Sequence, residues 1–242
     1  MDNLIKQKNI DIIVQARTGS SRLPNKIMKY LEDKLVLDHV IERLQKSKYA
    51  RQVVICTSNK EEDNVIYEHC YKNNVKCFRG SELNVLERYY ETATFFKSDY
   101  ILRVTSDCPL VDAYYLDLLI EKYFELNQQY LGPKYYGNHK FPDGFNGEVF
   151  NYNVLKEAYE NASENEKEHV TSYIIKKYKT TEFDYPIEYL KYKNINFSHL
   201  HLSLDTAEDY ELLKNIFQYV YLQKNNFKIE DVLDYLDQKN LY

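Results

Sequence analysis

The chain has 242 residues, of which 44% are hydrophobic and 29% charged, an ordinary composition for a globular protein. Its formal net charge of −5 argues against nonspecific nucleic-acid binding, because neutralising phosphates requires a basic face. No apolar run approaches the roughly 20 residues that a membrane span needs, and the polar N-terminus does not resemble a signal peptide. We therefore expect a cytoplasmic protein with one domain over residues 1–242 and with no nucleic-acid or membrane partner.

The first predicted element is a short buried strand at Ile10–Val14, which opens at once into a polar loop that ends near Lys26. The loop carries cations and small residues: Gln15, Ala16, Arg17, Gly19, Ser20, Ser21, Arg22 and Lys26. Such a loop can direct backbone N–H groups and fixed positive charge at a polyphosphate. The common phosphate-binding loop needs the pattern GxxxxGK[ST], which is missing here, so the arginines and lysine must supply more of the charge. Any one of these cations alone would be interpreted as solvated surface charge.

Strands and helices then alternate along the chain. Apolar residues at helical spacing predict helices at Leu35–Lys48, Glu61–Asn73 and Asn84–Lys97. Short apolar runs predict further strands at Val53–Cys56, Val75–Phe78 and Tyr100–Val104. Short joints between alternating strands and helices predict an α/β fold with a doubly wound, mostly parallel sheet. Ligands of such sheets lie beyond the carboxyl ends of the strands, so the polar residues that follow Val14, Cys56 and Val104 should line one crevice.

The middle of the chain, about residues 128–197, breaks this alternation. It contains prolines and the glycine-bearing run Pro142–Glu148, which is typical of turns rather than of a crossover helix. We interpret it as an inserted segment that supplies substrate and dimer contacts. The sheet pattern then resumes as a predicted strand at Leu200–Leu204, and Asp205 or Thr206 can cap a helix that begins near Ala207.

Two aspartates are placed to hold a divalent cation. Asp107 lies just past the predicted strand Tyr100–Val104, after Thr105 and Ser106, and Asp205 follows the predicted strand Leu200–Leu204. Magnesium takes few protein carboxylates and shares its remaining positions with water and phosphates, so two aspartates facing a cationic loop fit a metal–triphosphate site. The alternative is that Asp107 begins a turn before Pro109 and that Asp205 only caps a helix.

Several motifs together resemble the spore-coat-polysaccharide type of cytidylyltransferase, a group similar to the CMP-Kdo and CMP-sialate synthetases. They occur in the right order over most of the chain: ARTGSSRLPNK (16–26), FRGSELNVLERYY (78–90), RVTSDCPLVD (103–112), PDGFNGEVF (142–150), EHVTSYI (168–174) and LSLDTAEDYELL (202–213). The resemblance implies a GT-A-like Rossmann fold and an enzyme that transfers CMP from CTP to an acceptor, releases pyrophosphate and uses Mg²⁺. It also implies a homodimer and an anionic, sugar-like acceptor, acidic or phosphorylated, destined for a surface polysaccharide.

The resemblance further implies roles for individual residues. Arg17, Lys26 and Arg22 would hold the triphosphate, and Asp107 and Asp205 would hold the metal, so that Arg17, Lys26 and Asp107 are the expected catalytic residues. Other positions would lie near the nucleotide: Gln15, Ala16, Gly19, Ser20, Ser58, Arg79, Ser81, Thr105 and Ser106. Glu148 and His169 would lie where the acceptor binds, although Glu148 could equally be a salt-bridged structural residue and His169 a packed histidine within a helix at Glu166–Tyr178.

Departures from the pattern keep two alternative functions open. CMP-Kdo synthetases carry a QGDEP-like segment where this chain has Thr105 to Pro109, and the spore-coat group usually has glycine where Ser106 stands. The aspartate is kept, so the metal role carries over, whereas the identity of the acceptor does not. A GT-A glycosyltransferase would share the sheet but should carry a DxD motif, which the sequence does not contain. A non-catalytic nucleotide-binding protein would bind CTP without turning it over.

Overall fold

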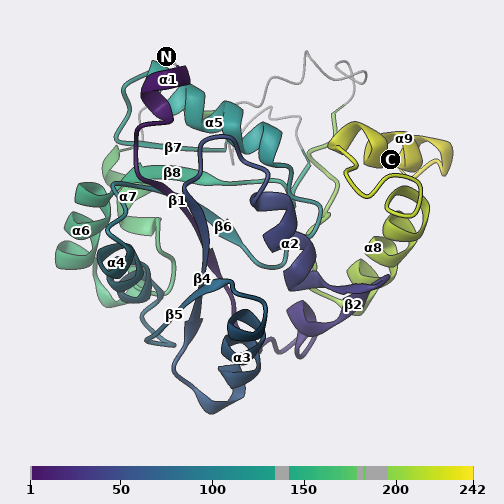
Figure 1. Cartoon of the computed structure of the whole chain (residues 1–242), viewed down its shortest axis with the longest axis horizontal. Helices are drawn as coiled ribbons and strands as arrows, with labels where there is room; N and C mark the ends of the chain where they lie inside the picture. Colours follow the sequence, from purple (N-terminus) through teal and green to yellow (C-terminus); the bar gives the residue numbers. More distant parts are fainter. Residues whose placement is uncertain (1, 134–141, 179–181, 184–195, 242) are drawn as a thin grey trace.

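The computed structural model describes residues 2–133, 142–178, 182–183 and 196–241. Its centre is a sheet with the strand order β5-β4-β1-β6-β8-β7-β9 (Figure 1). The strands are β1 (Ile10–Gln15), β4 (Gln52–Ser58), β5 (Lys76–Gly80), β6 (Tyr100–Thr105), β7 (Tyr130–Pro133), β8 (Glu148–Asn151) and β9 (Glu182–Phe183). Strands β5, β4, β1 and β6 are parallel, β8 is antiparallel to both β6 and β7, and β9 is parallel to β7. The expected α/β fold with a mostly parallel sheet is confirmed.

Helices cover both faces of this sheet. They are α1 (Asp2–Ile5), α2 (Val36–Leu44), α3 (Asn64–Lys72), α4 (Val85–Phe96), α5 (Ala113–Glu125), α6 (Tyr152–Asn161), α7 (Ser172–Tyr178), α8 (Ala207–Val220) and α9 (Ile229–Gln238). Helices α4, α6 and α7 gather on one side of the sheet, on the left in Figure 1, whereas α2, α8 and α9 lie on the other. A small antiparallel pair, β2 (Tyr30–Leu31) and β3 (Lys34–Leu35), precedes α2. No helix of the described residues is long and apolar enough to cross a membrane.

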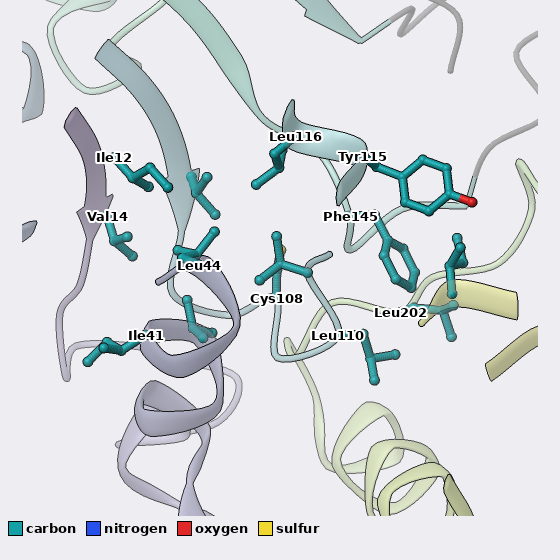
Figure 2. Packing of buried hydrophobic residues seen from close by; sticks show 14 of the residues in the cluster. Ile12, Val14, Ile41, Leu44, Cys108, Leu110, Tyr115, Leu116, Phe145 and Leu202 are labelled. Atoms are coloured by element: carbon teal, nitrogen blue, oxygen red, sulfur yellow. The ribbon is translucent and has the colours of Figure 1, made fainter. Parts of the chain in front are cut away.

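Strands β1 and β4 are buried on both faces because their side chains alternate between two cores. Ile12 and Val14 of β1 join a large core that contains residues of α2, α5, α8 and α9, whereas Ile13 packs into a second core with residues of α4, α6 and α7. Figure 2 shows part of the larger core, where Ile41 and Leu44 of α2 point toward β1 and Cys108 is seen between Leu116 of α5 and Leu110. All four cysteines are free thiols, as expected for a chain without paired cysteine motifs.

The order of the strands creates a switch point beside β1. From β1 the chain adds β4 and then β5 on one side, and it returns to place β6 on the other side. Strands β1 and β6 are parallel, so their carboxyl ends lie at the same edge of the sheet, and the reversal of strand order opens a crevice between the segments that follow them. The loop after β1 and the residues after β6 face this crevice, so the fold places Ala16 to Lys26 opposite Thr105, Ser106 and Asp107.

Most predicted elements are confirmed, with ends displaced by a few residues. The predicted helix at Leu35–Lys48 is α2 and ends at Leu44, and the one at Glu61–Asn73 begins as a short 3-10 turn before α3. The capping prediction near Ala207 is confirmed at Thr206, whose hydroxyl accepts a hydrogen bond from Asp209 N at 3.2 Å.

The predicted strand at Leu200–Leu204 is wrong. These residues form an irregular segment that is held by Leu204 N donating to Asp107 O at 2.8 Å and by Asp143 N donating to Leu200 O at 3.1 Å. Their alternating apolar side chains, Leu202 and Leu204, are buried in the larger core without any ladder, so burial produced a strand-like pattern in a loop. Asp205 therefore reaches the site from this loop and not from the end of a strand.

The middle segment contributes to the main sheet in its described part. Strands β7 and β8 extend the sheet beyond β6, and α6 and α7 cover the face that α4 also covers. Residues 134–141, 179–181 and 184–195 of the expected insertion lie outside the described residues. The helix α5 was not predicted from the sequence, although its buried residues Leu116, Leu119, Ile120 and Tyr123 follow helical spacing.

Candidate functional site

A cleft of about 230 Å³ opens at the carboxyl ends of β1 and β6. Its walls come from the loop after β1, the end of β6, the first turns of α4, the turn before α7 and the segment before α8. The lining residues are Gln15, Ala16, Arg17, Gly19, Ser20, Lys26, Ile27, Val85, Arg88, Thr105, Ser106, Asp107, Glu168, His169 and Asp205. Most of the positions that the sequence singled out for the nucleotide and the metal therefore meet in one place.

The loop after β1 is held in shape by a buried carboxylate. Asp63 accepts hydrogen bonds from Thr18 N and Thr18 Oγ1, each at 2.7 Å, and from Ser58 Oγ at 2.5 Å. Burial alone would raise the pKa of Asp63, but the hydrogen bonds from Ser58 and Thr18 lower it. Leu23 and Ile27 are buried and anchor the far end of the loop. The loop is thus fixed before any ligand binds, which limits the entropy lost on binding.

Two carboxylates converge on one lysine at the floor of the cleft. Lys26 Nζ lies 2.7 Å from Asp107 Oδ2 and 2.9 Å from Asp205 Oδ1. Arg22 Nη2 also lies 3.1 Å from Asp205 Oδ1, although Arg22 does not line the cleft itself. Partial burial lowers the pKa of Lys26, but Asp107 and Asp205 outweigh this effect and raise it. Burial likewise acts to raise the pKa of Asp205, while Lys26 and Arg22 lower it, so the ionised pair is favoured.

The same geometry fits a magnesium ion shared with phosphates. Both aspartates present an oxygen to one point of positive charge, the Lys26 ammonium, so a single cation could be reached by both. Among the residues that the structure describes, no group of three or more His, Cys, Asp or Glu side chains could enclose a metal. Two carboxylates with open positions suit magnesium, which completes its coordination with water and substrate phosphates.

Arg17 and His169 lie at the exposed edge of the cleft. Arg17 is solvent-exposed and lines the cleft beside Gly19 and Ser20. His169 is also exposed and sits in the turn before α7, because α7 begins only at Ser172; the predicted helix at Glu166–Tyr178 starts too early. The packed-histidine interpretation of His169 is therefore wrong, and its side chain is available to a ligand.

Besides Arg22, three predicted nucleotide contacts lie outside the cleft. Ser58 is buried against Asp63, and Ser81 Oγ accepts a hydrogen bond from Asn84 N at 3.1 Å. Arg79 clamps the segment after β4 by donating to Ser58 O at 3.0 Å and to Lys60 O and Asn64 Oδ1 at 2.6 Å each. In this arrangement these residues shape the wall of the site, and their direct contact with a nucleotide stays a prediction.

Glu148 is buried behind the cleft and does not line it. It pairs with Arg103 Nη1 through Oε2 and accepts a hydrogen bond from Tyr130 OH through Oε1 at 2.7 Å. Arg103 Nη2 in turn donates to Gln15 Oε1 at 3.1 Å, so the chain of contacts from Glu148 ends on a residue of the cleft. The arrangement matches the structural interpretation of Glu148 that the sequence left open, with Gln15 as the group that it positions.

Sequence reasoning missed four lining residues: Ile27, Val85, Arg88 and Glu168. Arg88 lies inside the motif FRGSELNVLERYY, where only Arg79 and Ser81 were singled out. Val85, Arg88 and Thr92 share a face of α4 at spacings of three and four, and all three are buried. An arginine on the apolar face of a predicted helix is unusual, so the sequence alone could have marked Arg88 as a candidate site residue.

Comparison with known proteins gives consistent matches. A family model described as cytidylyltransferase matches residues 12–241. The spore coat polysaccharide biosynthesis protein SpsF of Bacillus subtilis is 34% identical over 217 residues, which are 87% of each chain. A 3-deoxy-manno-octulosonate cytidylyltransferase of Elusimicrobium minutum is 34% identical over 102 residues, 41% of this chain and 40% of that protein. The solved structure of a cytidylyltransferase from Leptospira borgpetersenii has a TM-score of 0.86 at 30% identity and covers 97% of this chain and 96% of that one.

Proposed function

The chain belongs to the cytidylyltransferase family of CTP-dependent nucleotidyltransferases, and we propose that it transfers CMP from CTP to an anionic, sugar-like acceptor with release of pyrophosphate. The observation that carries this proposal is the cleft in which the cationic loop after β1 faces Asp107 and Asp205. A triphosphate needs fixed positive charge along its length, and the attacked phosphorus needs charge stabilisation as the leaving group departs. The cleft brings the positive charge for the triphosphate and the groups that can stabilise the departing phosphate to one edge of the sheet.

The reaction follows from where these charges lie. An oxygen of the acceptor attacks the α-phosphorus of CTP, the bond to the β-phosphate oxygen breaks, and pyrophosphate leaves with its electron pair. A hydroxyl acceptor also releases one proton to the surroundings. Arg17 and Lys26 bind the phosphates and offset the negative charge that builds up on them, while Gly19 and Ser20 allow the backbone to approach. The protein's part is mainly positioning and electrostatics.

Asp107 and Asp205 would hold magnesium in this reaction. Their convergence on Lys26 supports the assignment, because the same oxygens could bind one cation when a triphosphate gives Lys26 another anionic partner. When bound, magnesium neutralises phosphate charge and orients the α-phosphorus for attack. Lys26 then pairs with phosphate oxygens in place of the carboxylates.

The acceptor is proposed to be an acidic or phosphorylated sugar-like compound for a surface polysaccharide. The names of the Bacillus and Elusimicrobium relatives support this class, since one refers to polysaccharide biosynthesis and the other to an acidic sugar. His169 lines the cleft and is exposed, so it can contact such an acceptor. We also propose that the enzyme is a cytoplasmic homodimer that uses the middle segment for its interface; sedimentation velocity on the purified chain tests the dimer.

Two measurements on the purified protein test the proposed function. Calorimetry with CTP, UTP, ATP and GTP, each with and without Mg²⁺, should show tight binding of CTP alone. Incubation with CTP, Mg²⁺ and a panel of acidic and phosphorylated sugars should then release pyrophosphate and produce a CMP-linked product detectable by mass spectrometry. Turnover of a nucleotide-sugar without pyrophosphate would instead establish a glycosyltransferase, and CTP binding without turnover against any acceptor would favour a nucleotide-binding protein.

A further inference from the structure

A second cavity, also of about 230 Å³, lies between the end of α2, the first turn of α5 and the segment before α9. It shares no lining residue with the cleft at the ends of β1 and β6. Four of its lining residues are cations, namely Arg43, Lys46, Lys48 and Lys228, in a chain whose formal net charge is −5. Positive charge gathered around a cavity of an acidic protein favours a small anion there.

Arg43 is the buried and rigid part of this cavity. It is 6% exposed, its Nε donates to Val111 O at 2.6 Å, and its Nη2 donates to Leu110 O and Phe227 O at 3.2 Å each. The guanidinium also lies over the ring of Phe227, 4.1 Å from the ring centroid. The remaining nitrogen, Nη1, has no hydrogen-bond partner among the described residues and is not sealed in the core. Because a largely buried, charged donor is normally paired, Nη1 indicates that the cavity takes an acceptor.

Two lysines add charge to the cavity without being neutralised in it. Lys46 Nζ donates to Asn226 Oδ1 at 2.7 Å, and Lys228 Nζ lies 5.2 Å from the centroid of the Tyr114 ring, so both contact uncharged groups. Burial, followed by the charge of Arg43, lowers the pKa of Lys46, which shows that the two cations disfavour each other. An anion bound between them would relieve this repulsion.

The acids that line the cavity are engaged with other groups. Asp112 caps α5 through its Oδ1, and its Oδ2 is buried. Asp117 accepts hydrogen bonds from Ser47 Oγ at 2.5 Å and from Lys48 N at 3.0 Å. Lys48 Nζ itself pairs with Glu121 at 2.6 Å. The cations left to a ligand are therefore the arginine and the other two lysines.

We propose that this cavity binds a phosphate dianion, either as inorganic phosphate or as the phosphate group of a small monoester. A phosphate group carries about two negative charges at neutral pH and several acceptor oxygens, so it can accept from Arg43 Nη1 and also pair with Lys46 and Lys228. A carboxylate has one charge and two oxygens and would leave part of this set unpaired. The first turn of α5, at Ala113 and Tyr114, lines the same cavity with the positive end of a helix.

The volume of the cavity restricts the ligand to a small one. Typical ligand pockets measure about 300–1,000 Å³, so a cavity of about 230 Å³ suits a phosphate ion or a sugar phosphate rather than a nucleotide. The proposal does not depend on the transfer of CMP, since none of the residues in the cavity takes part in that reaction.

The test measures binding of inorganic phosphate and of glucose 6-phosphate by calorimetry without Mg²⁺. We compare the wild-type protein with the double variant Lys46→Met/Lys228→Met, which should fold because both lysines are exposed. At least one probe should bind the wild-type protein with a Kd below about 1 mM and the double variant about 10-fold or more weakly. Lys214→Met is the control, because Lys214 pairs with Glu211 on α8 outside the cavity. Absence of binding to the wild-type protein, or equal weakening by Lys214→Met, would overturn the proposal.

Further measurements locate the bound phosphate and identify its source. Arg17→Ala, a variant of the other cleft, should bind the probe as the wild-type protein does. Loss of binding in Arg17→Ala but not in Lys46→Met/Lys228→Met would show that the probe occupies that cleft and would refute the proposal. Tighter binding of glucose 6-phosphate would support a monoester as the ligand, and tighter binding of inorganic phosphate would support the free ion.

A footprint on the wild-type protein keeps the proposal testable if the double variant does not fold. Limited lysine acetylation, quantified by mass spectrometry, should show that the probe protects Lys46 and Lys228 and leaves Lys214 unchanged, because a bound phosphate would cover only the lysines that line the cavity. Equal acetylation of Lys46 and Lys228 with and without the probe would contradict binding in this cavity.

Discussion

Replacing Glu148 by glutamine separates a positioning role from an acceptor contact. The change keeps the size of the side chain and can keep the hydrogen bond from Tyr130 OH to Oε1, which is 2.7 Å long. It removes the negative charge that faces Arg103, and the Glu148 side chain is only 3% exposed and that of Arg103 17%. Removing one partner of a buried ion pair leaves the other charge uncompensated and costs about 3–5 kcal/mol.

That cost is a large share of the stability of the fold. Natural domains unfold with about 5–15 kcal/mol, so the variant should lose a substantial part of it. For a chain of this length, each kcal/mol lowers Tm by about 2–4 °C, which gives an expected decrease of about 6–20 °C. Urea denaturation followed by circular dichroism measures the free energy, and thermal unfolding provides the Tm. Glu125→Gln is the control, because Glu125 is 53% exposed in its pair with Lys122 and should cost less than about 1 kcal/mol.

Glu148→Gln should also affect the cleft, because Arg103 contacts the lining residue Gln15. Arg103 donates to Gln15 Oε1, so loss of the Glu148 charge should loosen Arg103, let the Gln15 amide rotate and weaken CTP binding by a few fold. Replacing both partners by apolar residues, Arg103→Met with Glu148→Leu, should restore most of the stability because no charge is left unpaired, but not the position of Gln15. A Glu148→Gln protein with wild-type stability and wild-type CTP binding, yet a raised KM for the acceptor, would refute this reasoning and establish an acceptor contact.

Three further variants test the metal site, the phosphate contact and the loop. Asp107→Asn should fold normally and lose Mg²⁺-dependent pyrophosphate release, since a metal ligand is removed; near-normal rates would contradict the metal assignment. Arg17→Ala should raise the Kd for CTP by about 10- to 100-fold in calorimetry, and an unchanged Kd would place the triphosphate elsewhere. Asp63→Asn should reduce stability most at neutral pH. Because the folded-state pKa of Asp63 is lowered, its contribution is present above the unfolded pKa, about pH 4, and is lost as the pH falls through the folded pKa. The difference in unfolding free energy between wild type and variant should shrink below pH 4, and a difference that is independent of pH would show that Asp63 acts only by packing.

The sequence was sufficient to predict those features that depend on position along a strand. Ile10–Val14 is apolar throughout, which is typical of a strand buried on both faces, and the polar residues that follow it had to emerge at the edge of the sheet. Because parallel strands end at the same edge, Gln15 to Lys26 and Thr105 to Asp107 could be placed together without knowing any contact between them. The meeting of Lys26 with Asp107 at 2.7 Å confirms that argument.

Features that depend on a distant partner could not be predicted in the same way. The alternation of Leu202 and Leu204 fits either a strand or a buried loop, since both side chains would be buried in either case. Only the pairing of the backbone with a neighbouring strand distinguishes the two, and this segment has no such pairing. Glu148 lies in a motif typical of the family, yet its burial beside Arg103, which is 45 positions away, decides between a ligand contact and a structural ion pair. Helix α5 follows a polar turn at Asp107 to Asp112, and Asp112 accepts a hydrogen bond from Tyr114 N to begin it.

Arg17 and Arg88 illustrate the difference between features that depend on sequence position and features that depend on a distant partner. Arg17 is exposed on a loop after a strand, where sequence position alone indicates a phosphate contact that any nucleoside triphosphate would satisfy. Arg88 is buried by the packing of α4 on the sheet, and its Nη1 donates to the Ser81 carbonyl, so only the folded structure places it in the wall of the cleft. Loop cations steer and bind charge with little dependence on the base, whereas discrimination between bases requires donors that are desolvated and rigid. The exposed cations of this site therefore follow from position along the sequence, whereas a buried donor such as Arg88 depends on the packing of a helix.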